Sequence, residues 1–164
     1  MQIPFGDHNR YSAAQSHIGM TYRTFAGVTV GESIDCGAVT VDREEIVTFG
    51  ERYDPLEIHT DPVAAADSPF GDIIASGIHT FALTQSPVVE TFYGDSDVIA
   101  AGHIEDLRFP TPVRPDDTLA VELEILDKRP SAGNDARGVV TARRTAAVKG
   151  EAVLEMRNET VWAR

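Results

Sequence analysis

Apolar and polar residues alternate most clearly in the second half of the chain. Residues 119–125 read LAVELEI, with Leu, Val, Leu and Ile at every second position, and this predicts a strand with one buried and one solvated face. Residues 139–148 and 152–162 flank a Lys-Gly turn and are expected to pair as a hairpin. Residues 103–109 form another strand candidate, and residues 39–41 form a short one earlier in the chain. These patterns predict a largely antiparallel sheet.

The first half carries helix signals instead. Asp42 followed three residues later by Glu45 is a capping box, so we expect a helix from Arg43 to about Arg52. Asp54 should lie just past the C-terminal end of this helix, because the proline that follows Asp54 stops the helix. Asp61-Pro62 repeats the start signal and predicts a short second helix.

A longer, more apolar helix is expected to begin after Ser76, a candidate N-cap, and to end at Gly94. Pro87 should kink or split it. As the most apolar helix of the chain, it is predicted to be central. Helices early and antiparallel strands late indicate the α+β class, with helices on one face of the sheet.

Length and charge limit the architecture and the partners. A chain of 164 residues with 42% apolar content fits one globular domain. We expect an N-terminal arm over residues 1–20 and a domain over residues 21–164. The sequence shows no signal peptide and no apolar run of membrane-spanning length, so we expect a cytoplasmic protein with no membrane partner. A net charge of −12 argues against binding to nucleic acid.

The only cysteine, Cys36, excludes a disulfide within the chain. No histidine stands near it in the sequence to act as a base. We therefore interpret it as a small buried hydrophobic residue.

The densest candidate chemistry lies between Tyr53 and Thr80. Asp54 and His59 are five residues apart across Pro55, and a turn at the proline would aim both side chains at one point, as a general acid/base pair requires. A non-catalytic loop histidine is the alternative. A metal site is a weaker one, because the spacing matches no tight ligand pattern and no cysteine is near.

The run FGERYDPLEIHTDPVAAADSPFGDIIASGIHT over residues 49–80 resembles the MaoC-like dehydratase or (R)-specific enoyl-CoA hydratase family. A second block, DLRFPTPVRPDDTLAVELEIL over residues 106–126, resembles the strand–bend–strand segment of that family. It departs at Asp116, where a glycine is more usual. The resemblance covers roughly residues 27–161.

The resemblance implies a hot-dog fold, in which an antiparallel sheet wraps around a long central helix, and a homodimer or higher homo-oligomer. It implies a lyase of fatty acid metabolism that hydrates a trans-2-enoyl thioester of coenzyme A or dehydrates the 3-hydroxyacyl thioester. Asp54 and His59 would then activate water, and the N–H of Gly77 would polarise the thioester carbonyl. This chemistry needs no metal and no cofactor beyond the coenzyme A of the substrate.

Four further residues are candidates for substrate binding. Ser76 stands beside Gly77, Phe81 and Ser86 follow on the predicted central helix, and Arg114 lies in the predicted bend, where it would meet the phosphates of coenzyme A. Phe81 is expected to line the acyl tunnel. The other three also have a simpler interpretation: Ser76 as an N-cap, Ser86 as a helix serine, and Arg114 as a solvated or paired cation.

Leu56 is the main departure from the family pattern, which commonly has asparagine two residues after the aspartate. Leucine cannot form the hydrogen bond of that asparagine. A non-catalytic subunit or acyl-CoA-binding partner therefore remains an alternative function, and a hot-dog thioesterase is a further one. The sequence leaves open the length, branching or carboxylation of the acyl group.

Overall fold

The structure is a computed structural model that describes residues 22–164, so the predicted arm over residues 1–20 lies outside the described residues. The helices are α1 (Arg43–Tyr53), α2 (Glu57–Thr60), α3 (Pro62–Ala66), α4 (Gly77–Val88) and a π-helical segment η1 (Val89–Tyr93). The strands are β1 (Ser33–Thr40), β2 (Val98–Arg108), β3 (Thr118–Ser131), β4 (Asn134–Val148) and β5 (Glu151–Ala163). None of the helices within residues 22–164 has the length and apolar character that a bilayer span requires.

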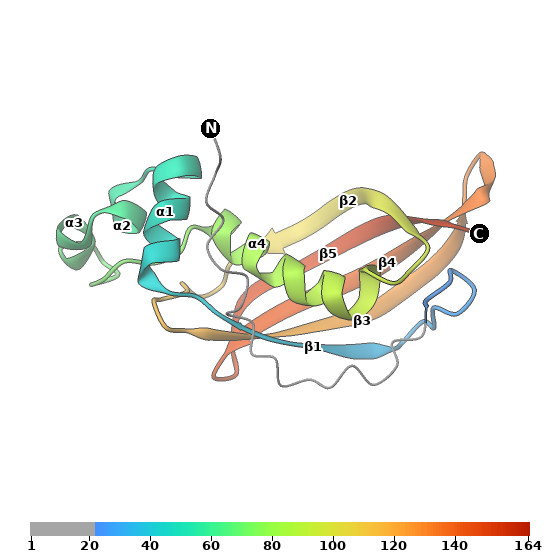
Figure 1. The fold of residues 1–164 in the computed structure, drawn as a ribbon, viewed down its shortest axis with the longest axis horizontal. Helices are drawn as coiled ribbons and strands as arrows, with labels where there is room; N and C mark the ends of the chain where they lie inside the picture. The colour runs from blue at the N-terminus through green and yellow to red at the C-terminus, as the bar shows by residue number, and fades with distance from the viewer. Residues whose placement is uncertain (1–21) are drawn as a thin grey trace.

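The five strands form one antiparallel sheet in the order β1-β3-β4-β5-β2. The sheet curls around α4, while α1, α2 and α3 gather beside the N-terminal end of α4 (Figure 1). This arrangement confirms the predicted α+β class and the hot-dog architecture. β2 lies beside β5 rather than beside β3, its neighbour along the chain.

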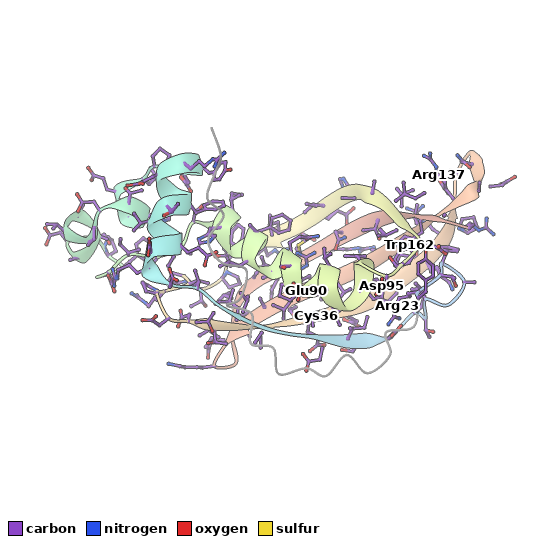
Figure 2. The ribbon with its side chains drawn as sticks, viewed as in Figure 1. Arg23, Cys36, Glu90, Asp95, Arg137 and Trp162 are labelled. Atoms are coloured by element: carbon purple, nitrogen blue, oxygen red, sulfur yellow. The ribbon has the colours of Figure 1, made fainter. Side chains whose placement is uncertain are left out.

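The core lies between α4 and the concave face of the sheet. The alternation predicted over residues 119–125 is confirmed, because its apolar side chains are at most 2% exposed and face this core. Trp162 on β5 is fully buried and packs edge-on against Phe92 of η1, with 5.7 Å between ring centroids. Figure 2 shows Trp162 and Cys36 on the sheet, beneath the helical layer.

The helix ends follow the predicted caps. Asp42 accepts a hydrogen bond from the N–H of Glu45 at 2.8 Å, and Asp61 accepts from that of Val63 at 2.8 Å. Pro87 neither breaks nor splits the helical segment. Instead, α4 changes to the π-helical η1 two residues later, and Gly94 caps its end. A proline removes one helical hydrogen bond, and the wider π turn absorbs such a local disruption.

The first strand is longer than predicted. β1 already begins at Ser33, before the short strand predicted over residues 39–41. Gly37, with φ of +83°, sits in an irregularity between Asp35 and Ala38. This bulge shifts the alternation of buried positions, so a simple two-residue period failed to detect the strand.

Replacing the same side chain inside and outside the core tests the packing. Leu123 is fully buried and Leu56 is 56% exposed. We expect Leu123→Ala to lower the free energy of unfolding by about 2–5 kcal/mol, because it removes buried surface and leaves a cavity. Leu56→Ala should change it by less than about 0.5 kcal/mol. Denaturant unfolding at equal protein concentrations measures both, and equal costs would contradict the core assignment.

Candidate active site

The end of α1 and the short helix α2 bring Asp54 and His59 together. Asp54 caps α1, with its N–H bonded to the carbonyl of Gly50 at 2.9 Å, and Pro55 then turns the chain. His59 on α2 is 5% exposed. Its Nε2 lies 3.5 Å from Oδ2 of Asp54, whose side chain remains 33% exposed. The predicted pair is therefore assembled in space, with the aspartate facing solvent and the histidine buried.

One extended segment, residues 74–76, fixes both side chains. The carbonyl of Ile74 lies 2.8 Å from Nδ1 of His59, and the hydroxyl of Ser76 donates to Oδ2 of Asp54 at 2.6 Å. The segment itself is tied to α2 by the bond from the N–H of Ile74 to the carbonyl of Ile58 at 3.1 Å. Ser76, predicted as an N-cap and substrate contact, therefore also positions Asp54. Its hydroxyl does accept from the N–H of Ile78 at 3.3 Å, as a cap should.

These hydrogen bonds determine what His59 can do. A carbonyl oxygen only accepts, so Nδ1 of His59 carries the proton that points to Ile74. In the neutral imidazole, Nε2 then has a free lone pair beside the carboxylate of Asp54. Two acceptors that face each other at 3.5 Å are suited to share the hydrogens of one water or hydroxyl group. This is the geometry that a general base and an orienting carboxylate require.

Gly50 controls how closely α1 approaches α2. A Cβ atom at this position would lie 3.0 Å from Cβ of His59 and 3.0 Å from Cγ2 of Thr60. Such contacts are tighter than ordinary packing, so a larger residue would push the two helices apart. The separation of Asp54 and His59 therefore depends on a glycine that sequence analysis did not single out. Its position opposite His59 follows only from the fold.

Gly77 begins α4, so its N–H has no partner in the preceding turn and points out of the helix end. A Cβ atom here would lie 2.7 Å from the ring of Phe109, which follows β2 and is 40% exposed. The close approach of this aromatic ring therefore favours glycine at position 77. Phe109 also places an apolar wall beside the helix N-terminus, and sequence analysis missed it.

The other predicted substrate contacts occupy different places. Phe81 is partly buried on α4, one turn after Gly77. Ser86 donates to Oε1 of Glu90 at 2.9 Å, and the guanidinium of Arg114 donates to the carbonyl of Phe70 at 2.9 Å. Both polar side chains therefore already have partners on the protein, and their binding roles stay predictions.

Two further residues near the helices, Cys36 and His79, bear on the chemistry. Cys36 is buried, as predicted, and burial raises the pKa of its thiol to about 11, so the nucleophilic thiolate is scarce at neutral pH. His79 is buried and stacks on Phe49 of α1 with 4.4 Å between ring centroids, so it packs between α4 and α1. Within residues 22–164, no three His, Cys, Asp or Glu side chains are grouped closely enough to hold a metal ion.

The fold and the site define a hot-dog protein whose Asp–His pair lies at the N-terminal end of its central helix. Residues 15–148 match the MaoC-like domain family. This match covers most of the chain, which therefore belongs to that family and confirms the resemblance seen in the sequence.

Individual relatives agree with this membership. The chain is 36% identical over 90 residues to 3-hydroxyacyl-thioester dehydratase Z of Mycobacterium tuberculosis, covering 54% of this chain and 58% of that protein. The MaoC-like dehydratase of Rhodospirillum rubrum superposes with a TM-score of 0.76 at 33% identity, over 85% of this chain and 95% of the other. The R-hydratase PhaJ1 of Pseudomonas aeruginosa superposes with a TM-score of 0.66 at 25% identity, over 85% and 84% of the two chains.

The contact between Gly77 and Phe109 can be tested with a double-mutant cycle. We expect Gly77→Ala to lower the free energy of unfolding by about 1–3 kcal/mol, because the new methyl group meets the ring. Adding Phe109→Ala should recover at least about 0.5 kcal/mol of that loss, since the two residues share one contact. Unfolding of the wild type, both single variants and the double variant measures the coupling. Strictly additive costs would show that the ring does not constrain Gly77.

Proposed function

We propose that this protein is a lyase that adds water to a trans-2-enoyl thioester of coenzyme A, or removes water from the 3-hydroxyacyl thioester. The observation that carries the proposal is the Asp54–His59 pair, held by Ser76 and by the Ile74 carbonyl beside the N-terminus of α4. Family membership supports it, as do the names of a thioester dehydratase and an R-hydratase among the relatives.

In the proposed reaction, His59 and Asp54 share the attacking water. Nε2 of His59 takes a proton as the oxygen bonds to C3 of the thioester, while Asp54 accepts the second hydrogen and fixes the orientation of the water. His59 then returns the proton to C2. Hydroxyl and hydrogen have been added across the double bond, and both side chains recover their starting protonation states. Dehydration follows the same steps in reverse.

The N–H of Gly77 is the proposed donor to the thioester oxygen. Addition at C3 places negative charge on that oxygen before C2 is protonated, and a helix N-terminus stabilises such charge through its free N–H groups and its dipole. The apolar ring of Phe109 beside Gly77 would limit solvent there and strengthen the hydrogen bond. The scheme uses no metal and no redox cofactor. A cytoplasmic location stays a prediction.

Leu56 keeps one alternative open. Its side chain is 56% exposed next to Asp54 and supplies no side-chain cap to α2. The hydrogen bond expected from the asparagine of the family pattern is therefore absent at this position. A subunit that binds acyl thioesters without converting them would show the same feature, although the Asp54–His59 geometry favours an enzyme.

Absorbance of the conjugated thioester tests the activity. Wild-type protein should consume crotonyl-CoA or a longer enoyl-CoA, and Asp54→Asn and His59→Ala should each lower the rate by about 10²–10⁴-fold, the usual size of an acid/base contribution. Glu57→Gln is the matched control: it removes a carboxylate between the two residues that is exposed, and it should leave the rate unchanged. Release of free thiol instead would identify a thioesterase, and silence across a panel of acyl groups would favour the non-catalytic subunit.

We also propose a homodimer that forms through β2. This strand lies at one edge of the sheet, and within residues 22–164 it pairs only with β5. Nearly all of its residues are exposed, including Ile99 at 52% and Ile104 at 44%. An open strand edge with exposed apolar side chains is a ready pairing surface.

Sedimentation velocity at micromolar concentrations tests this assembly. The wild type should sediment as a dimer, and Ile104→Lys should shift it towards the monomer because the substitution places a charge in the proposed interface. Val30→Lys, at a site 52% exposed before β1, is the control and should remain dimeric. A monomeric wild type, or a dimer unaffected by Ile104→Lys, would refute the interface.

A further inference from the structure

A buried arginine lies in the core beneath α4. Arg144 on β4 is 2% exposed, and its guanidinium donates to Oγ1 of Thr84 at 3.2 Å and to Oε1 of Gln85 at 2.8 Å. It also lies under the ring of Phe81, 5.5 Å from the centroid. These three residues belong to α4, so Arg144 reaches from the sheet to the middle of the central helix, and all of its contacts there are uncharged.

The charge of Arg144 has no counter-ion among residues 22–164. None of the ion pairs in this part of the chain includes it, and its Nε has no hydrogen-bond partner there. Burial accordingly lowers the pKa of Arg144. A buried cation normally pairs with an anion, because losing water costs more than neutral hydrogen bonds return. The described residues offer this charge two neutral hydrogen bonds and the ring of Phe81, which is less than a carboxylate partner would supply.

Two other buried polar groups lie near Arg144. The hydroxyl of Tyr93 interacts electrostatically with Arg144. On β5, Met156 pairs directly with Arg144, and Asn158 lies diagonally across from Arg144. Burial raises the pKa of Tyr93, and side-chain hydrogen bonds to Asn158 and Thr160 oppose that shift, so these polar groups serve one another although their geometry is loose. Among residues 22–164, the Nε–H of Arg144 is the donor of this cluster that is left without a partner.

The guanidinium has donors available for such a partner. Arginine carries five N–H groups, and the two contacts to Thr84 and Gln85 leave the N–H of Nε and further terminal hydrogens unused. The Nε–H and a neighbouring terminal N–H form the edge that binds a carboxylate through two parallel hydrogen bonds. The chemistry of the free edge therefore matches a carboxylate.

Arg144 lies in line with the proposed thioester position. Thr84 and Gln85 follow Gly77 by seven and eight residues on α4, which corresponds to about 10–12 Å along the helix axis. An acyl group whose carbonyl meets the N–H of Gly77, and which runs along the sheet side of α4, would extend towards Arg144. The guanidinium is enclosed, with the ring of Phe81 beside it, so the acyl chain reaches it only after neighbouring side chains move.

We propose that Arg144 binds a carboxylate at the far end of the acyl chain, so that the substrates are enoyl thioesters with a second, terminal carboxyl group. This inference rests on the proposed hydratase function and narrows it to a substrate class. Arg144 is a specificity residue in this scheme and touches none of the reacting atoms.

Two enoyl-CoA thioesters of equal chain length, one ending in a methyl group and the other in a carboxylate, test the proposal. The wild type should favour the carboxylate by at least about tenfold in kcat/KM, since the alternative leaves the cation unpaired. Arg144→Met should remove or invert this preference while keeping activity on the methyl-ended thioester. Arg144→Lys keeps the charge without the planar fork and should retain part of the preference.

Arg143→Met is the matched control, because Arg143 points to the opposite face of the sheet and pairs with Glu124 at 2.9 Å. It should not alter the preference. Three outcomes would show that Arg144 only clamps α4. The wild type could convert the two thioesters at equal rates, it could prefer the methyl-ended thioester, or Arg144→Met could lose activity equally on both. If Arg144→Met does not fold, the proposal is tested by the preference of the wild type for the carboxylate-ended thioester and by the reduction of that preference in Arg144→Lys.

A failure of the proposed function can be separated from a failure of this inference. If the wild type hydrates neither thioester, binding is measured instead as the rise in the Tm of the protein. The ligands are two saturated acyl-CoA thioesters of equal chain length, one ending in a methyl group and the other in a carboxylate. A larger rise with the carboxylate-ended compound, lost in Arg144→Met, supports the carboxylate site on a protein that is not a hydratase. Equal rises would refute the site as well.

Discussion

The candidate site depends on one short extended segment, residues 74–76, between α3 and α4. This segment bonds α2 through the N–H of Ile74 and the bend at Val113 through the N–H of Ala75 at 2.8 Å. The same three residues hold His59 by a carbonyl and Asp54 by the Ser76 hydroxyl. His59 is therefore held by buried backbone, and Asp54 by the hydroxyl of a buried serine. Because both contacts come from one hydrogen-bonded segment, that segment fixes the separation of the two ionisable groups, as a preorganised site requires.

The central helix α4 continues this arrangement into the core. Its first residue, Gly77, follows Ser76 directly, so the segment that fixes the Asp–His pair also fixes the helix N-terminus. Two turns later the helix meets Arg144 through Thr84 and Gln85. The N–H of Gly77 and the guanidinium of Arg144 are thus held at a set distance by one rigid element. A helix is well suited to this purpose, because its rise per residue does not vary with the side chains it carries.

Local signals in the sequence were sufficient for much of the fold. The alternation over residues 119–125 predicted the buried face of β3, and Asp42, Asp61 and Ser76 predicted where helices begin. The Asp54–His59 pair was found because both residues belong to one local motif. The rest depends on contacts between segments far apart in the chain. Phe109 meets Gly77, the Ile74 carbonyl meets His59, and Arg144 meets Thr84 only after the sheet has closed around the helix. A single sequence contains no periodic or motif signal for such contacts.

Arg144 shows how stability and specificity separate in this core. Its neighbours on the same face of the sheet are mostly apolar, among them Ala142, Ala146 and Met156. In other proteins, replacing buried charges with apolar side chains of similar volume is often neutral or stabilising, so the fold alone does not require an arginine here. Under the proposed function, a cation that lacks a counter-ion within residues 22–164 would make the core selective, because an acyl chain without a negative charge would leave the guanidinium uncompensated, whereas a carboxylate would pair with it. Discrimination between substrates is thus a reason for an arginine at a position where packing alone favours an apolar side chain.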